Sequence, residues 1–108
     1  MASPDELERR HTLTTATDRY DALRMRDALA AMDPDNETAL SPDETLEMLA
    51  LSEVIIRKAG YGRQAMVRSA RAAGASWTRI GAALGTSKQA AWESHQRWID
   101  DQAGVDRA

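Results

Sequence analysis

Four polar side chains of complementary chemistry lie within ten residues near the C-terminal end of the chain. Lys88 and Arg97 are cations, Gln89 carries an amide and Glu93 a carboxylate. A cation can contact a phosphate or the acceptor edge of guanine, and an amide can both donate to and accept from adenine. A carboxylate can accept from the amino group of cytosine. Side chains of these types can therefore contact the phosphates and base edges of a nucleic-acid duplex, if the fold presents them together.

Two short helices are predicted to position these residues. Ser76 is expected to cap the first, over residues 77–84, and Gly85 to end it, because glycine can adopt a positive φ. Ser87 is expected to cap the second, which is predicted from Lys88 to about Asp100. The first helix carries one apolar stripe at helical spacing, made of Trp77, Ile80, Gly81 and Leu84.

The second predicted helix has two faces of different character. One arc, at 100° per residue, is predicted to pack on the fold and consists of Ala91, Trp92, His95, Trp98 and Ile99. The opposite arc is polar, lies where base edges would be met, and consists of Gln89, Ala90, Glu93, Gln96 and Arg97. His95 is interpreted as a packed core residue and the tryptophans as core rather than as stacking platforms.

The two helices, joined by a short turn with a glycine, match the helix-turn-helix pattern. The turn Leu84-Gly85-Thr86-Ser87 is similar to the turn of that family, and Ile80, Gly81 and Ala91 stand at its apolar, small and buried positions. The segment GASWTRIGAALGTSKQAAWES resembles small actinobacterial helix-turn-helix proteins and, more distantly, the homeodomain-like region 4 of sigma factors. The resemblance implies that the helix from Ser87 enters the DNA major groove.

Further contacts to the DNA backbone are expected around the turn. Thr78 and Arg79, at the start of the first helix, are predicted to set the register on the phosphates without reading sequence. The N–H groups at Ser76 and Ser87 can hold phosphates at helix starts. Arg68 and Arg71 are candidate phosphate contacts, with a merely solvated helix face as the alternative.

Charge is divided along the chain. The net charge is -3, but residues 1–56 carry -8, residues 57–98 carry +7 and residues 99–108 carry -2. Local potential, rather than net charge, attracts phosphate, so the basic segment favours a DNA partner. The alternative is that the acidic half folds against the basic half and neutralises it.

The acidic half is predicted to be helical. Ser3-Pro4-Asp5-Glu6 and Ser41-Pro42-Asp43-Glu44 are typical of capped helix starts. The first stretch is expected from Pro4 to about Met32, weakened by its threonines and divisible in two with Thr15 as the second cap. Helices are also expected over 42–59 and 63–73, with a loop over 33–37 that lacks the glycine of a calcium loop. The expected core residues are Tyr20, Leu23, Ala28, Leu29, Met32, Leu46, Leu49, Ala50, Leu51, Val54, Ile55, Met66, Val67 and Ala70.

The 108 residues therefore predict an all-α fold of five helices, or six if the first is broken, sharing one core. An acidic region (1–59), expected to form a dimer, would join a basic helix-turn-helix region (60–108) in one compact domain. Only about eight residues are expected after the last helix, too few for a β-hairpin wing. The absence of cysteine excludes disulfides, and the absence of a signal core or a long apolar run predicts a cytoplasmic, nucleoid-associated protein.

The function expected is sequence-preferring binding to double-stranded DNA, as a transcriptional regulator that forms a homodimer on two half-sites. No nucleophile, metal-ligand or phosphate-loop pattern occurs, so we expect no enzyme, no metal and no cofactor. Two alternatives stay open: a helix-turn-helix that binds a protein of the transcription machinery, and an architectural protein that coats DNA. The net negative charge argues against coating.

Overall fold

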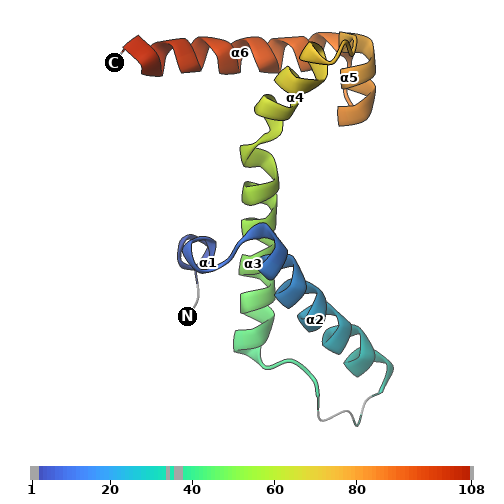
Figure 1. The fold of residues 1–108 in the computed structure, drawn as a ribbon. Helices are drawn as coiled ribbons and strands as arrows, with labels where there is room; N and C mark the ends of the chain where they lie inside the picture. The colour runs from blue at the N-terminus through green and yellow to red at the C-terminus, as the bar shows by residue number, and fades with distance from the viewer. Residues whose placement is uncertain (1–2, 34, 36–37, 108) are drawn as a thin grey trace. The chain divides into compact units, whose positions relative to one another are not determined.

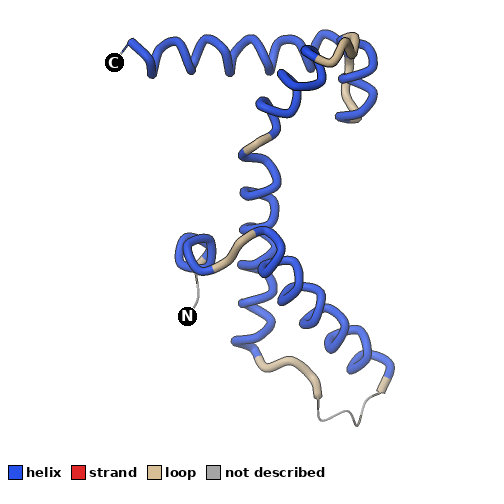
Figure 2. The backbone as a smooth tube through the Cα atoms, in the orientation of Figure 1, coloured by secondary structure: helices blue, strands red, loops and turns tan. Residues whose placement is uncertain are grey.

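The computed structural model describes residues 3–33, 35 and 38–107, and in this part of the chain every regular element is an α-helix (Figures 1 and 2). The all-α prediction is thus confirmed. The six helices are α1 (Pro4–Arg10), α2 (Leu13–Met32), α3 (Pro42–Tyr61), α4 (Arg63–Ala72), α5 (Trp77–Leu84) and α6 (Lys88–Arg107).

The first helical stretch is broken, but one turn earlier than expected. Thr12, not Thr15, is the N-cap of α2, and its hydroxyl accepts from the backbone N–H of Thr15 at 3.1 Å. The Thr15 hydroxyl accepts in return from the N–H of Thr12 at 3.0 Å. Thr15 therefore stands at the third helical position, where it completes a capping box.

Both Ser-Pro phrases start helices as predicted. The Ser3 hydroxyl accepts from the N–H of Glu6 at 3.2 Å. At α3 the box is reciprocal, since the N–H of Glu44 donates to Ser41 and the N–H of Ser41 donates to the Glu44 carboxylate, each at 3.1 Å. These side chains satisfy N–H groups that have no partner inside the helix.

The last helix is longer than predicted. It continues past Asp100 to Arg107, through residues expected to form a tail. Residues 101–103 contain no helix breaker, and Gln96 Nε2 donates to Asp100 Oδ1 at 3.3 Å one turn later. Helical periodicity alone did not reveal this extension, because its residues are mostly polar.

The chain forms two compact units, an N-terminal unit (residues 1–61) and a C-terminal unit (residues 62–108). The buried residues likewise form two clusters rather than the single shared core that we expected. Each cluster is completed by partly buried side chains of its own unit, so apolar burial is achieved locally.

The core of the N-terminal unit is contributed by three helices. Its fully enclosed residues are Leu7 of α1, Ala16 and Leu23 of α2, and Leu51 and Val54 of α3. Five other residues predicted to lie in this core are exposed: Ala28, Leu29, Met32, Leu46 and Leu49. The prediction was wrong for them because α2 and α3 each carry apolar residues on more than one face, and only one face is covered.

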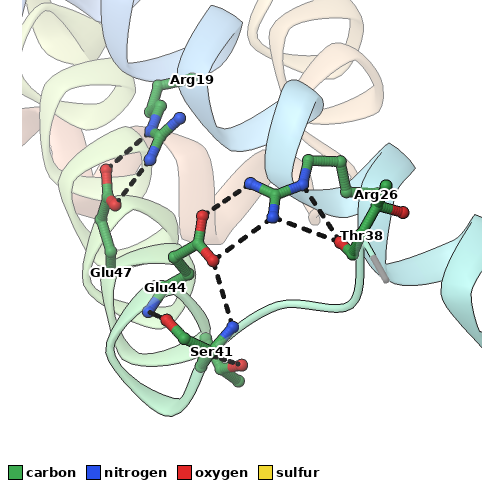
Figure 3. Close-up of polar contacts among 7 residues, drawn as sticks. Arg19, Arg26, Thr38, Ser41, Glu44 and Glu47 are labelled. Carbon is green, nitrogen blue, oxygen red and sulfur yellow. Dashed lines mark hydrogen bonds and ion pairs between the residues drawn. The ribbon is translucent and has the colours of Figure 1, made fainter. Parts of the chain in front are cut away.

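Two ion pairs, which lie next to each other, tie α2 to α3 (Figure 3). The Arg19 guanidinium donates to both carboxylate oxygens of Glu47, at 2.8 and 3.0 Å. Arg26 donates to Glu44 at 2.6 Å and also to the carbonyl oxygen of Thr38, which fixes the end of the loop. The Arg26 hydrogen bond, followed by the bond from Ser41, lowers the pKa of Glu44 to about 2.

Arg57 joins α1 to α3 in the same way. It donates to Asp5 at 2.7 Å, to Glu8 at 3.2 Å and, within α3, to Glu53 at 3.1 Å. The Tyr61 hydroxyl also donates to Glu8, and this bond is the main cause of the lowered pKa of that carboxyl group. In the loop predicted over 33–37, Asp33 caps the end of α2 and Asp35 lies in a turn, whereas Pro34, Asn36 and Glu37 lie outside the described residues.

Candidate nucleic-acid interface

The α5–α6 pair is built as the local sequence predicts. Ser76 Oγ accepts from the N–H of Arg79 at 3.2 Å and caps α5, and Ser87 Oγ accepts from the N–H of Ala90 at 3.0 Å and caps α6. Gly85 ends α5 with φ of +72°, a left-handed conformation that side chains disfavour. The two helices are thus joined by the three residues from Gly85 to Ser87.

Gly81 is the point where the two helices meet. An ideal Cβ atom at this position would lie 2.9 Å from the carbonyl oxygen of Thr86 and 3.0 Å from the nitrogen of Lys88. Both neighbours are backbone atoms, which cannot turn away as a flexible side chain would. The small residue is therefore required for the close approach of α5 to the first turn of α6.

A small hydrophobic cluster packs against α5 and α6 and holds them together. Val67 of α4, Ile80 of α5 and Ala91 of α6 are buried, with Trp77 and Ala70 packed against them. Met66 and Leu84 were predicted to point inward but are exposed. Both lie at the edge of their apolar stripes, and the small cluster covers only the centre of each stripe.

His95 is the one buried polar side chain among the described residues. Its ring stacks on Trp98 with 5.4 Å between centroids and tilts against Trp77 at 5.5 Å. Nδ1 lies 2.9 Å from Gln64 Oε1. Burial, and next the charge of Arg68, lower the pKa of His95, so the neutral ring is favoured at neutral pH. The interpretation of His95 as a packed residue is confirmed.

The predicted packing face of α6 is narrower than expected. Ala91 and His95 are buried and Trp98 is half-buried, but Trp92 and Ile99 are exposed, Trp92 to 43%. The prediction that all three tryptophans lie in the core was wrong for Trp92. It stands at the edge of the arc, where neither α4 nor α5 reaches far enough to cover it.

The opposite face of α6 carries most of the predicted base-contacting residues. Gln89, Glu93 and Arg97 are exposed there, whereas Lys88 is exposed at the first position of α6, outside that arc. Gln89 Nε2 donates to Glu93 Oε1 at 2.9 Å, and Arg97 donates to Ser94 Oγ at 3.2 Å. The face is therefore polar and accessible, with its amide and carboxylate joined to each other.

Two residues of the predicted polar arc lie closer to the fold than expected. Ala90 is half-buried and lines a pocket of about 240 Å³ with Gln64 of α4 and Leu84 of α5. Gln96 is half-buried and is bonded to Asp100. Ala90 thus offers only part of its methyl group to a partner.

The residues predicted to contact the DNA backbone differ in the interactions that they form within the protein. Thr78 and Arg79 are exposed in the first turn of α5, and Ser76 and Ser87 are exposed but serve as caps. Arg71 stacks its guanidinium over Trp77 at 5.2 Å and donates to the carbonyl oxygen of Ala75. Arg68 stacks over Trp98 at 5.4 Å. Both arginines are exposed, so each combines a packing role with an open cationic edge.

The electrostatics of the two units differ. The C-terminal unit has seven cations and four carboxylates, a net charge of +3, and no ion pair joins two of its described side chains. In the N-terminal unit, Arg19, Arg26 and Arg57 are all paired with carboxylates. The cations around α5 and α6 are therefore not neutralised within their own unit.

Sequence reasoning missed two features. Gln64, the partner of His95, is a polar residue on an otherwise basic helix and gave no signal by its spacing. The exposed row Met25, Leu29 and Met32 on α2 had a readable spacing of i, i+4 and i+7, but its last two members were assigned to the core.

Metal sites, membrane spans and known relatives each bear on what the chain could do. Among them, no three His, Asp or Glu side chains come together as metal ligands would. No helix in the described part of the chain combines the length and apolarity needed to cross a membrane. Comparison with known proteins gives no match, whether to a protein family, to a curated protein or to a solved structure.

Proposed function

We propose that this chain is a sequence-preferring double-stranded DNA-binding protein that uses α5 and α6 as a helix-turn-helix. One observation carries the proposal: the close contact at Gly81 presents α6 with an exposed polar face, in a unit whose described cations form no ion pair with its described carboxylates. A rigid, exposed helix with such a face fits the width of the major groove.

The residues of the face divide by role. Lys88, at the start of α6, would reach a phosphate or guanine, and Arg97, about two and a half turns on, would reach a phosphate. Gln89 would read adenine and Glu93 would accept from cytosine, while repelling phosphate in a wrong register. Thr78 and Arg79 would hold the backbone beside the groove.

A homodimer is part of the proposal, because one small module binds DNA weakly and two half-sites correct this. In the N-terminal unit, α3 offers a surface for it. Leu49 and Ile56 are exposed there on one face, and the intervening Glu53 accepts a hydrogen bond from Arg57. Association of two chains would allow two α6 helices to bind one duplex. The protein would then act as a transcriptional regulator and be associated with the nucleoid.

A second function is supported by a separate observation. Trp92 and Ile99 form an exposed apolar edge beside the polar face of α6. Such an edge suits a protein partner of the transcription machinery better than it suits DNA, since aromatic residues are enriched in protein interfaces. Under this alternative the cations of α6 would flank a protein contact.

Titration of labelled genomic duplexes at rising salt tests the proposal. We expect one fragment to be preferred at every salt concentration and affinity to fall steeply between about 50 and 200 mM salt. Lys88→Ala combined with Arg97→Ala should abolish binding and leave helicity unchanged. Absence of DNA binding would favour the protein-interaction function, and binding without preference would favour coating.

A matched control separates position from charge. Arg9→Ala with Arg10→Ala removes the same two charges from an exposed part of α1. This variant should bind DNA as the unaltered protein does. Equal losses from both variants would mean that net charge, and not the face of α6, determines binding.

A further inference from the structure

Helix α2 is apolar on two sides, and only one of them is covered. Ala16 and Leu23 are enclosed in the core, where α3 packs along the helix (Figure 1). On the other side, Met25, Leu29 and Met32 are exposed to 66%, 54% and 82%. Their spacing of i, i+4 and i+7 places them in one row, which we call the methionine face.

A row of this kind differs from scattered apolar residues. Single exposed apolar side chains are normal, but contiguous ones on a rigid element mark interaction sites. Methionine side chains are flexible and polarisable, and they adapt to partners of different shape. The N-terminal unit buries its core without these three residues, so the methionine face is free to bind another molecule.

The charges beside the face define its partner. Asp18 precedes Met25 by seven residues and Asp21 precedes it by four, so both continue the row toward the start of α2. Neither carboxylate forms an ion pair with a described residue. The N-terminal unit as a whole has seven cations and 13 carboxylates, a net charge of -6. The row is therefore apolar at one end and anionic at the other.

We propose that the methionine face of α2 binds a cationic amphipathic helix of a partner protein. The partner's apolar residues, spaced by three or four, would lie on Met25, Leu29 and Met32, and its lysines or arginines would pair with Asp18 and Asp21. A second copy of this face would bring like charges into the same contact, and an anionic membrane surface would be repelled. This surface belongs to a different unit from α6, and the proposal is independent of DNA binding.

A helical peptide of leucine and lysine, about 18 residues long and amphipathic, is the probe. Its binding to the full chain is measured by fluorescence anisotropy beside that of a leucine–glutamate peptide of the same pattern. We expect the cationic peptide alone to bind. Met25→Gln, Leu29→Gln and Met32→Gln together should weaken it roughly tenfold or more, at unchanged net charge and helicity. Asp18→Asn with Asp21→Asn should weaken it less and remove part of its salt dependence.

A matched control uses exposed apolar residues outside both proposed surfaces. Leu13→Gln with Met66→Gln also removes exposed apolar side chains without changing charge, and should leave peptide binding unaltered. Three results would overturn the proposal: equal binding by the anionic peptide, equal loss from the control variant, or no loss from the methionine-face variant. The proposal would also be overturned if the unaltered protein is an oligomer and the methionine-face variant has a lower molecular mass in solution. The face would then be occupied by a second copy of the chain.

The outcome is distinguishable from that of the DNA experiment. The methionine-face variant should bind a preferred duplex as the unaltered protein does, and Lys88→Ala with Arg97→Ala should bind the peptide normally. For each variant, the binding assay of the substituted surface tests the proposal, and the binding assay of the other surface shows that the protein is correctly folded.

Discussion

The amide of Gln89 donates a 2.9 Å hydrogen bond to Glu93 Oε1 across one turn of α6. The two side chains that would discriminate between bases therefore hold each other in the free protein. The amide keeps a second N–H and its carbonyl oxygen, and Glu93 keeps its other carboxylate oxygen, so under the proposed function the pair would contact adenine and cytosine without breaking this bond. The bond would also restrict the orientations of both side chains, so under the proposed function only a duplex that matches this arrangement would be bound tightly.

Replacing Glu93 tests this relationship. Glu93→Ala removes a carboxylate from the phosphate-facing side and frees Gln89. We expect tighter binding to any duplex and a weaker preference for the selected site, with about 1–3 kcal/mol of discrimination lost at one base pair. The measurement is the ratio of dissociation constants for the selected and a scrambled duplex at one salt concentration. An unchanged ratio would remove Glu93 from the reading residues.

The contact at Gly81 predicts the stability of the C-terminal unit. Gly81→Ala would place a methyl group against the backbone of Thr86 and Lys88, at a cost of about 1–3 kcal/mol. All three tryptophans, Trp77, Trp92 and Trp98, lie in this unit, so urea unfolding followed by tryptophan fluorescence reports on it alone. If α5 and α6 bind DNA as proposed, Gly81→Ala should also lower the affinity for DNA.

Gly104 of α6 is the control for that experiment. A Cβ atom there meets nothing within 4 Å, and the glycine lies inside a helix. Gly104→Ala should raise stability by up to about 1 kcal/mol, through the better helix propensity of alanine. Similar destabilisation by both substitutions would contradict the role assigned to Gly81.

The burial of His95 predicts a pH dependence near neutrality. Because its pKa is lowered in the folded chain, the unfolded chain binds a proton first as the pH falls below the ordinary value of 6.5. The stability of the C-terminal unit should therefore be highest above that value and fall as the pH approaches 5. The groups that face the ring are Gln64 and Arg68 of α4, Trp77 of α5 and Trp98 of α6.

His95→Gln should make this dependence flatter. Glutamine does not titrate and retains hydrogen-bonding groups that can serve Gln64. The comparison is the urea midpoint of tryptophan fluorescence at pH 7 and pH 5 for both proteins. If the stability of the variant falls by the same amount between pH 7 and pH 5, a group other than His95 causes the pH dependence.

The ion pair between Arg26 and Glu44 makes a prediction for the N-terminal unit at lower pH. The pKa of Glu44 is lowered from 4.5 to about 2, so the contribution of the ionised carboxylate is present above 4.5 and lost as the pH falls toward 2. Arg26→Ala should raise this pKa toward 4.5, as followed by a carboxyl carbon titration in NMR. Arg24→Ala is the control, because Arg24 stacks on Tyr20 and lies on the same helix. It should leave the Glu44 pKa low.

The residues at helix ends were predictable because they act over three or four positions. Ser3, Ser41, Ser76 and Ser87 cap the helices assigned to them, and Gly85 adopts a left-handed conformation. Such signals depend on short stretches of chain and not on packing. The exception, Thr12 in place of Thr15, concerns a segment with four candidate threonines, where propensity alone does not choose among them.

The amino-acid sequence by itself determined that this chain is helical and where all its helices but α2 start, and the turn pattern placed Gly81 where α5 meets α6. The tertiary structure decided which apolar faces are covered. Periodicity marks every apolar row equally, but a row is buried only if a neighbouring helix lies over it. Leu23 and Leu51 have such a neighbour, whereas Met25, Met32 and Trp92 do not. Those uncovered rows, which no pattern in the sequence separated from the core, are where partners remain to be found.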